Sequence, residues 1–222
     1  AHACARAGVR RLVHVSALGV TDATHAPSRY LRSKAAGEEA LREVADIALT
    51  VLRPSLMFGA RDHMTRLFAS LQRMAPLVPL AGAEAKVQPV WVDDTARAIT
   101  RCLEHAPTIG QTYECAGPDV MTLAQLVRAC GRIAGVARPV IPVPGPIARV
   151  QAWVFEHLPG EPLITRDNLD SLSVPNIATG QLPGLPALGI HAASFDQIVP
   201  TYLQPRSGIA RLDAWRSTAR RD

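Results

Sequence analysis

The sequence has no glycine-rich turn of the form G-x-x-G-x-x-G or G-x-G-x-x-G between a strand and a helix. That turn holds the pyrophosphate of a dinucleotide at a helix N-terminus, so these residues contain no recognisable phosphate loop. There is also no run of eighteen apolar residues, no Cys-x-x-Cys pair among the four cysteines and no metal-ligand spacing among the seven histidines. The patterns therefore predict neither a spanning helix nor a metal centre, and the cysteines are expected to be buried free thiols.

What is present describes a globular chain. Hydrophobic residues make up 48% and charged residues 19% of 222 residues, which suits one or two domains with an apolar core. The net charge is +5, and much of it lies in a basic tail at 205–222. No nucleic-acid motif accompanies that tail, so we expect no nucleic-acid partner. A frayed tail and a contact with a membrane surface or protein partner both stay open, and the cysteine usage favours a cytoplasmic location or the inner-membrane surface facing it.

The stretch from Ser28 to Glu38 holds the first candidates for chemistry. Ser28 is a good N-cap, and alanines, leucines and paired charges continue the predicted helix to about Val44. Tyr30 and Lys34 are four residues apart, so they share one helix face. An ammonium near a phenol lowers the pKa of the tyrosine, which would make Tyr30 a proton donor or acceptor. Helices also produce this spacing by chance, and the alternative is a half-buried tyrosine beside a solvated lysine.

A short apolar, β-rich run at 11–15 predicts a buried strand just before this helix. Ser16 follows it in a small-residue turn. The residue therefore lies at the carboxyl end of a strand, where open α/β sheets bind their ligands.

A serine, a tyrosine and a lysine in this order resemble the site of the short-chain dehydrogenase/reductase superfamily. The segment 52–59, Leu-Arg-Pro-Ser-Leu-Met-Phe-Gly, resembles a segment of its extended and atypical branches that passes beside the nicotinamide. Residues 90–96 resemble their next strand-to-helix junction. Together these sequence segments most resemble the atypical, NAD-dependent epimerase/dehydratase-like group related to the Rossmann-type accessory subunit of respiratory complex I. The resemblance to the superfamily covers about residues 1–135.

The resemblance implies roles for named residues. The serine would bind the substrate oxygen, the tyrosine would exchange the proton, and the lysine would bind the nicotinamide ribose. The implied catalytic residues are Ser16, Tyr30 and Lys34. The implied cofactor-binding residues are Tyr30, Lys34, Arg53, Pro54 and Ser55. The cofactor would be NAD or NADP, and the substrate a carbonyl or sugar-like compound in a hydride transfer, alone or within an epimerase or dehydratase cycle.

A rival interpretation comes from the same resemblance. An accessory subunit of a respiratory complex, or a partner in quinone biosynthesis, would hold a dinucleotide for structure without turning it over. A regulatory redox sensor is a third class, weakened because such proteins often lose this tyrosine.

The order of predicted elements gives the fold class. Strands and helices alternate from 11–15 to 139–143, which predicts an α/β fold with a mainly parallel sheet, the carboxyl-terminal part of a Rossmann-like doubly wound sheet. We expect this sequence to be the carboxyl-terminal part of a longer protein, in which a first β-α-β-α-β portion of about 100 residues precedes it. The alternative is a complete protein that binds no dinucleotide. We expect three parts in the chain: a dinucleotide-binding domain at 1–55 and 87–135, a smaller substrate or partner lobe at 56–86 and 136–204, and the basic tail at 205–222.

Some charged residues are open to two interpretations. Asp93 and Asp94 could act as acid or base, but they also suit the N-cap and first turn of a helix at 93–105. Arg53 could bind a phosphate or close a structural ion pair. His63 could contact a substrate or simply lie at the surface where a helix starts.

Overall fold

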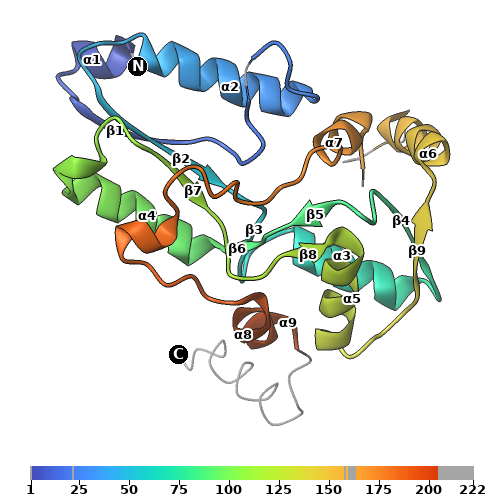
Figure 1. Cartoon of the computed structure of the whole chain (residues 1–222). Coiled ribbons are helices and arrows are strands. Elements are labelled where there is room, and N and C mark those ends of the chain that lie inside the picture. The colour runs from blue at the N-terminus through green and yellow to red at the C-terminus, as the bar shows by residue number, and fades with distance from the viewer. Residues whose placement is uncertain (1, 22, 158, 160–163, 205–222) are drawn as a thin grey trace, which may run out of the picture.

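The computed structural model describes residues 2–21, 23–157, 159 and 164–204. The basic tail predicted at 205–222 lies outside the described residues. Figure 1 shows two neighbouring groups of elements, one around a small sheet and one around three short strand pairs.

The first group is built on three parallel strands. β1 (Arg11–Val15), β2 (Ala48–Pro54) and β7 (Thr112–Cys115) lie in the order β1-β2-β7. Val15 stands opposite Leu52, and Pro54 stands opposite Cys115. Because all three strands run the same way, their carboxyl ends meet at one edge. The predicted α/β class with a parallel sheet is confirmed.

Helices cover both faces of this sheet. α2 (Arg29–Arg42) lies on one face and α4 (Val92–Glu104) on the other, while the short α1 (His2–Arg6) lies near the end of α2 (Figure 1). Buried apolar side chains from β2, α4 and β7 form one cluster with Leu185 and Leu188 of the 3₁₀ helix η2 (Leu185–Leu188), although that helix comes late in the chain.

The second group pairs strands from distant parts of the chain. β4 (Val78–Ala81) runs parallel to β9 (Val140–Val143). The remaining pairs are β3 (Met57–Phe58) with β6 (Val90–Trp91), parallel, and β5 (Lys86–Val87) with β8 (Met121–Thr122), antiparallel. Its helices are α3 (Met64–Met74), α5 (Leu123–Ile133), α6 (Gly145–His157), α7 (Arg166–Ser171), α8 (Phe195–Ile198) and α9 (Pro200–Leu203). A 3₁₀ turn, η1 (Ala106–Thr108), follows α4.

The largest apolar cluster holds this group together. Phe58 of β3 and Phe195 of α8 meet with ring centroids 5.0 Å apart. α3 and α5 approach closely at Gly131, where a Cβ atom would lie 2.0 Å from Oε1 of Gln72. α5, which was assigned to the dinucleotide-binding part, thus packs with α3 of the predicted substrate lobe, across the predicted boundary at residue 86. The predicted division into parts stays a prediction.

One local expectation is wrong. The helix expected at 93–105 is α4, which begins already at Val92 with Trp91 as its N-cap residue. Asp93 and Asp94 therefore both lie in the first turn, where carboxylates still interact favourably with the helix dipole. Neither aspartate is the N-cap.

Candidate functional site

The site begins with the helix that carries Tyr30 and Lys34. Ser28 caps α2 as predicted, because its hydroxyl accepts a hydrogen bond from Leu31 N at 3.1 Å. A second cap comes from far along the chain. The Asp167 carboxylate accepts from Arg29 N at 2.6 Å and from Tyr30 N at 3.2 Å. The first turn of α2 is therefore held from two sides.

Tyr30 is half-exposed, with 48% of its surface accessible. Its hydroxyl makes no hydrogen bond within the described part of the chain. Lys34 Nζ lies over the face of the ring, 5.9 Å from its centroid. Burial raises the pKa of Tyr30, so the lowered pKa expected from the lysine is not found.

Lys34 points to the end of the first strand. Its ammonium donates a hydrogen bond to the carbonyl oxygen of Val15 at 3.1 Å. An ammonium has three N–H donors, so two remain for other acceptors. The lysine thus stands at the carboxyl end of β1, next to the peptide that leads into Ser16.

Ser16 lies deeper than expected. The residue is only 2% exposed, and its N–H donates to the carbonyl oxygen of Leu52 at 2.7 Å. Its hydroxyl is close enough to the Glu38 carboxylate to favour its charged form, yet it meets the geometry of a hydrogen bond with no atom in the described residues. The structure brings Tyr30 and Lys34 together but does not join the Ser16 hydroxyl to them.

Residues 53–55 have protein partners. The Arg53 guanidinium forms a two-pronged ion pair with Glu38, at 2.9 and 2.7 Å. The Ser55 hydroxyl donates to Oδ1 of Asn176 at 2.7 Å, and the Pro54 carbonyl accepts from the N–H of Leu18 at 2.9 Å. These groups hold the sheet edge together, so the structural interpretation of Arg53 is the one that the geometry favours.

Glu38 was missed as a site residue, although it ends the stretch that carries Tyr30. It is 1% exposed and also lies 3.1 Å from Nη2 of Arg42. Burial raises the pKa of Glu38. The hydrogen bonds from Arg53, the nearby Ser16 hydroxyl and the charges of Arg53 and Arg42 outweigh burial, so the pKa lies below its usual value. The sequence did hold one signal for Glu38: it lies four residues after Lys34, and therefore on the same helix face.

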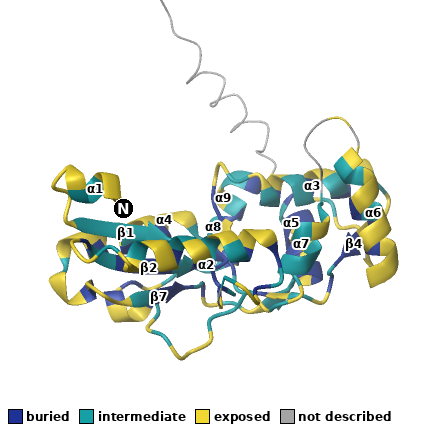
Figure 2. Cartoon of the chain, turned by 90° about the horizontal axis from the view of Figure 1, so that it is seen from above, coloured by how far each residue is buried: buried dark blue, intermediate teal, exposed yellow. Residues whose placement is uncertain are grey.

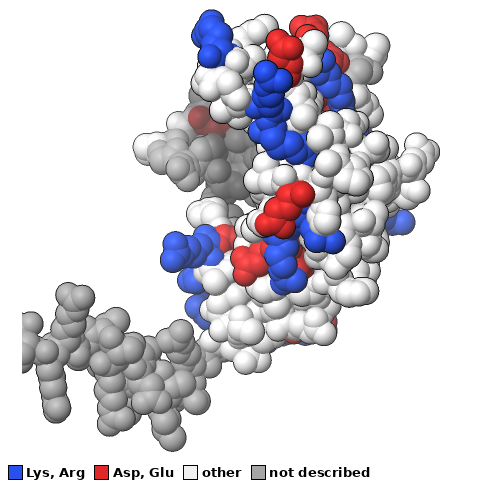
Figure 3. All heavy atoms as spheres, turned by 90° about the vertical axis from the view of Figure 1, so that its left-hand side faces the viewer, with Lys and Arg blue, Asp and Glu red and all other residues white. Residues whose placement is uncertain are grey.

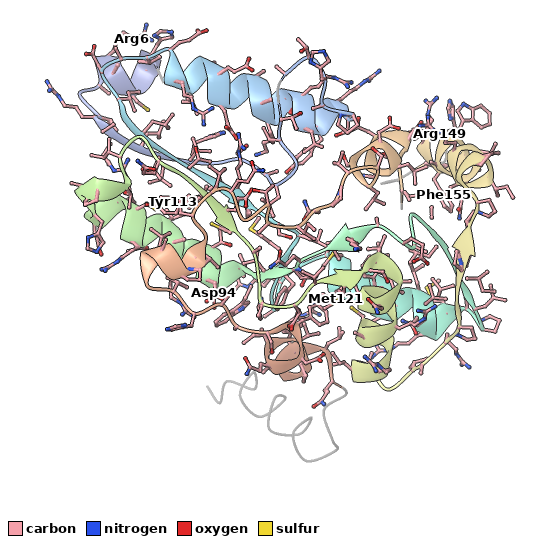
Figure 4. The ribbon with its side chains drawn as sticks, viewed as in Figure 1. Arg6, Asp94, Tyr113, Met121, Arg149 and Phe155 are labelled. Atoms are coloured by element: carbon pink, nitrogen blue, oxygen red, sulfur yellow. The ribbon has the colours of Figure 1, made fainter. Side chains whose placement is uncertain are left out.

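Asp94, the other candidate acid that is buried, has structural partners. Asp94 is fully buried, accepts a hydrogen bond from Ala193 N at 2.8 Å and lies 3.2 Å from Nη2 of Arg97 (Figure 4). At the start of α3, the capping side chain is Asp62, whose carboxylate accepts from Thr65 N at 2.6 Å. His63 at the N-cap makes no side-chain capping bond. No cluster of potential metal ligands occurs among the residues that were described.

Cavities do not mark the site. A cavity of about 420 Å³ lies beside α5 and is lined by residues that include Arg128, Arg132 and Asp196. A second, of about 240 Å³, lies where α2 ends, and neither is lined by Tyr30 or Lys34. Within the described ranges, no helix is long and apolar enough to cross a membrane.

Comparisons with known proteins agree with this arrangement. The model of the "NAD dependent epimerase/dehydratase family" matches residues 1–116. The chain is 36% identical over 196 residues to "NADH dehydrogenase [ubiquinone] 1 alpha subcomplex subunit 9, mitochondrial" of Rattus norvegicus, covering 86% of this chain and 50% of that protein. It is 28% identical to "Ceramide reductase" of Caulobacter vibrioides, covering 67% of this chain and 48% of that protein. The chain spans about half the length of these curated relatives.

A solved structure shows a similar fold. The NADPH-dependent quinone oxidoreductase QOR2 of Escherichia coli, complexed with NADPH, superposes with a TM-score of 0.68 at 18% identity. The match covers 90% of this chain and 68% of that structure.

Proposed function

Because the chain belongs to the NAD dependent epimerase/dehydratase family, we propose that it supplies the tyrosine and lysine of a site that uses NAD or NADP to transfer a hydride at a carbonyl or alcohol carbon. The observation that carries the proposal is the position of these two side chains. Tyr30 and Lys34 share one face of α2, and the lysine reaches the carboxyl end of β1 while the phenol stays half-exposed.

Each side chain has a chemical task. A tyrosine with a raised pKa is protonated near neutral pH, so Tyr30 acts as the acid that gives its proton to the substrate oxygen. Lys34 has two N–H donors free for the hydroxyls of a nicotinamide ribose. The dinucleotide, when bound, supplies or accepts the hydride at the carbon of that same bond. Ser16 joins the site as an oxygen ligand only if its hydroxyl turns away from Glu38.

The test uses the whole protein as its gene encodes it. Tyr30→Phe removes the hydroxyl and keeps the ring, so turnover on a panel of carbonyl and sugar-like compounds should fall by roughly 10²–10⁴-fold. Lys34→Met should lower turnover and also weaken nucleotide binding. Tyr113→Phe removes the same atom from a buried tyrosine on β7 and serves as the matched control. Wild-type turnover in the Tyr30→Phe variant would remove Tyr30 from the catalytic role.

A second function is favoured by the surface of α6. Four apolar side chains, each at least 42% exposed, line one side of this helix: Ile147, Val150, Trp153 and Val154. The charges beside them are paired, because Arg149 meets Asp170 and Arg166 meets Glu156, both at 2.8 Å (Figure 4). An uncharged helix face bordered by neutralised pairs suits an apolar protein surface better than an anionic lipid, which attracts unpaired cations.

This second function is that of a structural subunit. The chain would hold a dinucleotide without turning it over and assemble with a respiratory complex at the inner membrane; its relationship to a subunit of the rat NADH dehydrogenase supports such an assembly. Tyr30→Phe would then leave nucleotide occupancy and assembly intact, while Lys34→Met would still loosen the nucleotide. Val150→Ser should reduce co-migration with the membrane's NADH dehydrogenase on native gels. If a carbonyl substrate oxidises the bound NADH, the result supports hydride transfer and contradicts the purely structural function.

A further inference from the structure

Three side chains follow one another on the inner side of α2. Tyr30, Lys34 and Glu38 are each one helical turn apart. Their exposure falls along the helix, from a half-exposed tyrosine through a partly buried lysine to a glutamate that is 1% exposed. The helix therefore presents its proposed chemical groups at one end and a buried charge at the other.

The buried charge joins three elements. Glu38 belongs to α2, its main partner Arg53 belongs to β2, and Ser16 directly follows β1. The ion pair is two-pronged, which fixes the direction as well as the distance between α2 and β2. A buried carboxylate requires such partners, so this contact allows little sliding of the helix along the sheet.

The position of the helix controls the reach of the lysine. Lys34 Nζ meets the carbonyl oxygen of Val15, which leads directly into Ser16. Ser16 is in turn bound through its N–H to Leu52 of β2. Lys34 therefore meets the end of β1 and Glu38 meets Arg53 of β2, one turn of the helix apart, so a shift of α2 would move both contacts.

We propose that Glu38 is a positioning residue: paired with Arg53, it sets the height at which α2 holds Lys34 and Tyr30 over the carboxyl end of β1. The residue touches neither nucleotide nor substrate and acts through Lys34. This positioning role adds to the proposed hydride-transfer function. Of the two measurements that test it, only the nucleotide affinity rests on that function.

The first readout needs no nucleotide. The chain contains only two lysines, Lys34 and the exposed Lys86, so amine acetylation followed by mass spectrometry reports on Lys34 with Lys86 as internal reference. In the Glu38→Gln variant the labelling of Lys34 relative to Lys86 should rise by up to about tenfold, the change in population that one lost hydrogen bond produces. Glu39→Gln makes the same chemical change at an exposed neighbour and should have no effect.

The second readout separates positioning from general damage. NADH carries the nicotinamide ribose that Lys34 is proposed to bind, whereas ADP does not. Glu38→Gln in the whole protein should raise the Kd for NADH by about tenfold and change that for ADP by less than about twofold. A merely destabilised protein would lose affinity for both.

A more conservative variant tests the same role if the Glu38→Gln variant does not fold. Arg53→Lys keeps the positive charge but loses the two-pronged geometry, so it should move both readouts in the same direction by a smaller factor. Unchanged Lys34 labelling in both variants, or equal losses for NADH and ADP, would overturn the positioning role. If the wild-type protein binds neither nucleotide, the proposed function falls, and the labelling ratio still decides the role of Glu38.

Discussion

Single residues of α2 experience very different surroundings. Lys34 donates one hydrogen bond to a backbone carbonyl, Glu38 contacts two arginines, and the Tyr30 hydroxyl has no hydrogen-bond partner among the residues with a described structure. The spacing of four residues could predict that these side chains share a face. It could not predict that the ammonium lies over the tyrosine ring, because this depends on where β1 ends.

The Glu38 carboxylate should make stability depend on pH in a defined window. Its pKa in the folded chain is lowered from 4.5, so its ion pair contributes fully above pH 4.5 and is lost as the pH falls through the folded value. At pH 7 the Glu38→Gln variant should be less stable by about 3 kcal/mol, the lower range for breaking a buried pair. Urea unfolding at pH 7 and at successive values below 4.5 should show this difference shrinking. A difference that does not change with pH would contradict the ionised pairing.

Among the helices and strands, the sequence predicted those that a local periodic pattern of residues specifies. The helix at 28–44 is α2 (Arg29–Arg42), with Ser28 as its cap, and the strand at 11–15 is β1. The short pair β5 and β8 and the contacts of Asn176 were not predicted, because their partners are remote. Asn176 Oδ1 accepts from Ser55 Oγ over a separation of 121 residues, and no local pattern reveals such a bond.

Asp167 should control the first turn of α2. Its carboxylate takes two backbone N–H groups of that turn, so Asp167→Ala leaves them to water. Loss of a capping side chain costs about 1 kcal/mol, and amide hydrogen exchange at Arg29 and Tyr30 should rise by about fivefold.

The control lies on the same helix α7. Asp170→Ala breaks the contact with Arg149 but touches no group of α2, so exchange in α2 should stay unchanged. Equal exchange in both variants would show that Ser28 alone holds the turn.

The whole molecule is elongated, with the β1 sheet at one end and α6 with β4 at the other (Figure 2). Acidic and basic side chains lie side by side on the face seen in Figure 3, without a continuous basic patch there. The predicted relationship to the epimerase/dehydratase group and to the respiratory accessory subunit is confirmed by the family match and the curated relatives.

The 222-residue chain by itself should bind NADH very weakly. A dinucleotide is held largely by its pyrophosphate on a glycine-rich turn and a helix N-terminus, and this sequence contains no such turn. Calorimetric titration of residues 1–222 with NADH should give no measurable heat at micromolar concentrations. A micromolar Kd would show that Tyr30, Lys34 and their neighbours suffice for binding.

Residues 176–203, near the end of the described chain, make bonds to distant parts of the sequence. Thr179 N donates to Glu114 across 65 residues, and Ala193 N donates to Asp94 across 99 residues. Phe195 fills the largest apolar cluster. Contacts of such separation form slowly, because loop-closure entropy must be lost before they are made. A ribosome that has translated β1 to α5 therefore carries a nascent chain in which two of the three apolar clusters described still lack their last side chains, and these two clusters are completed only after synthesis has passed residue 203.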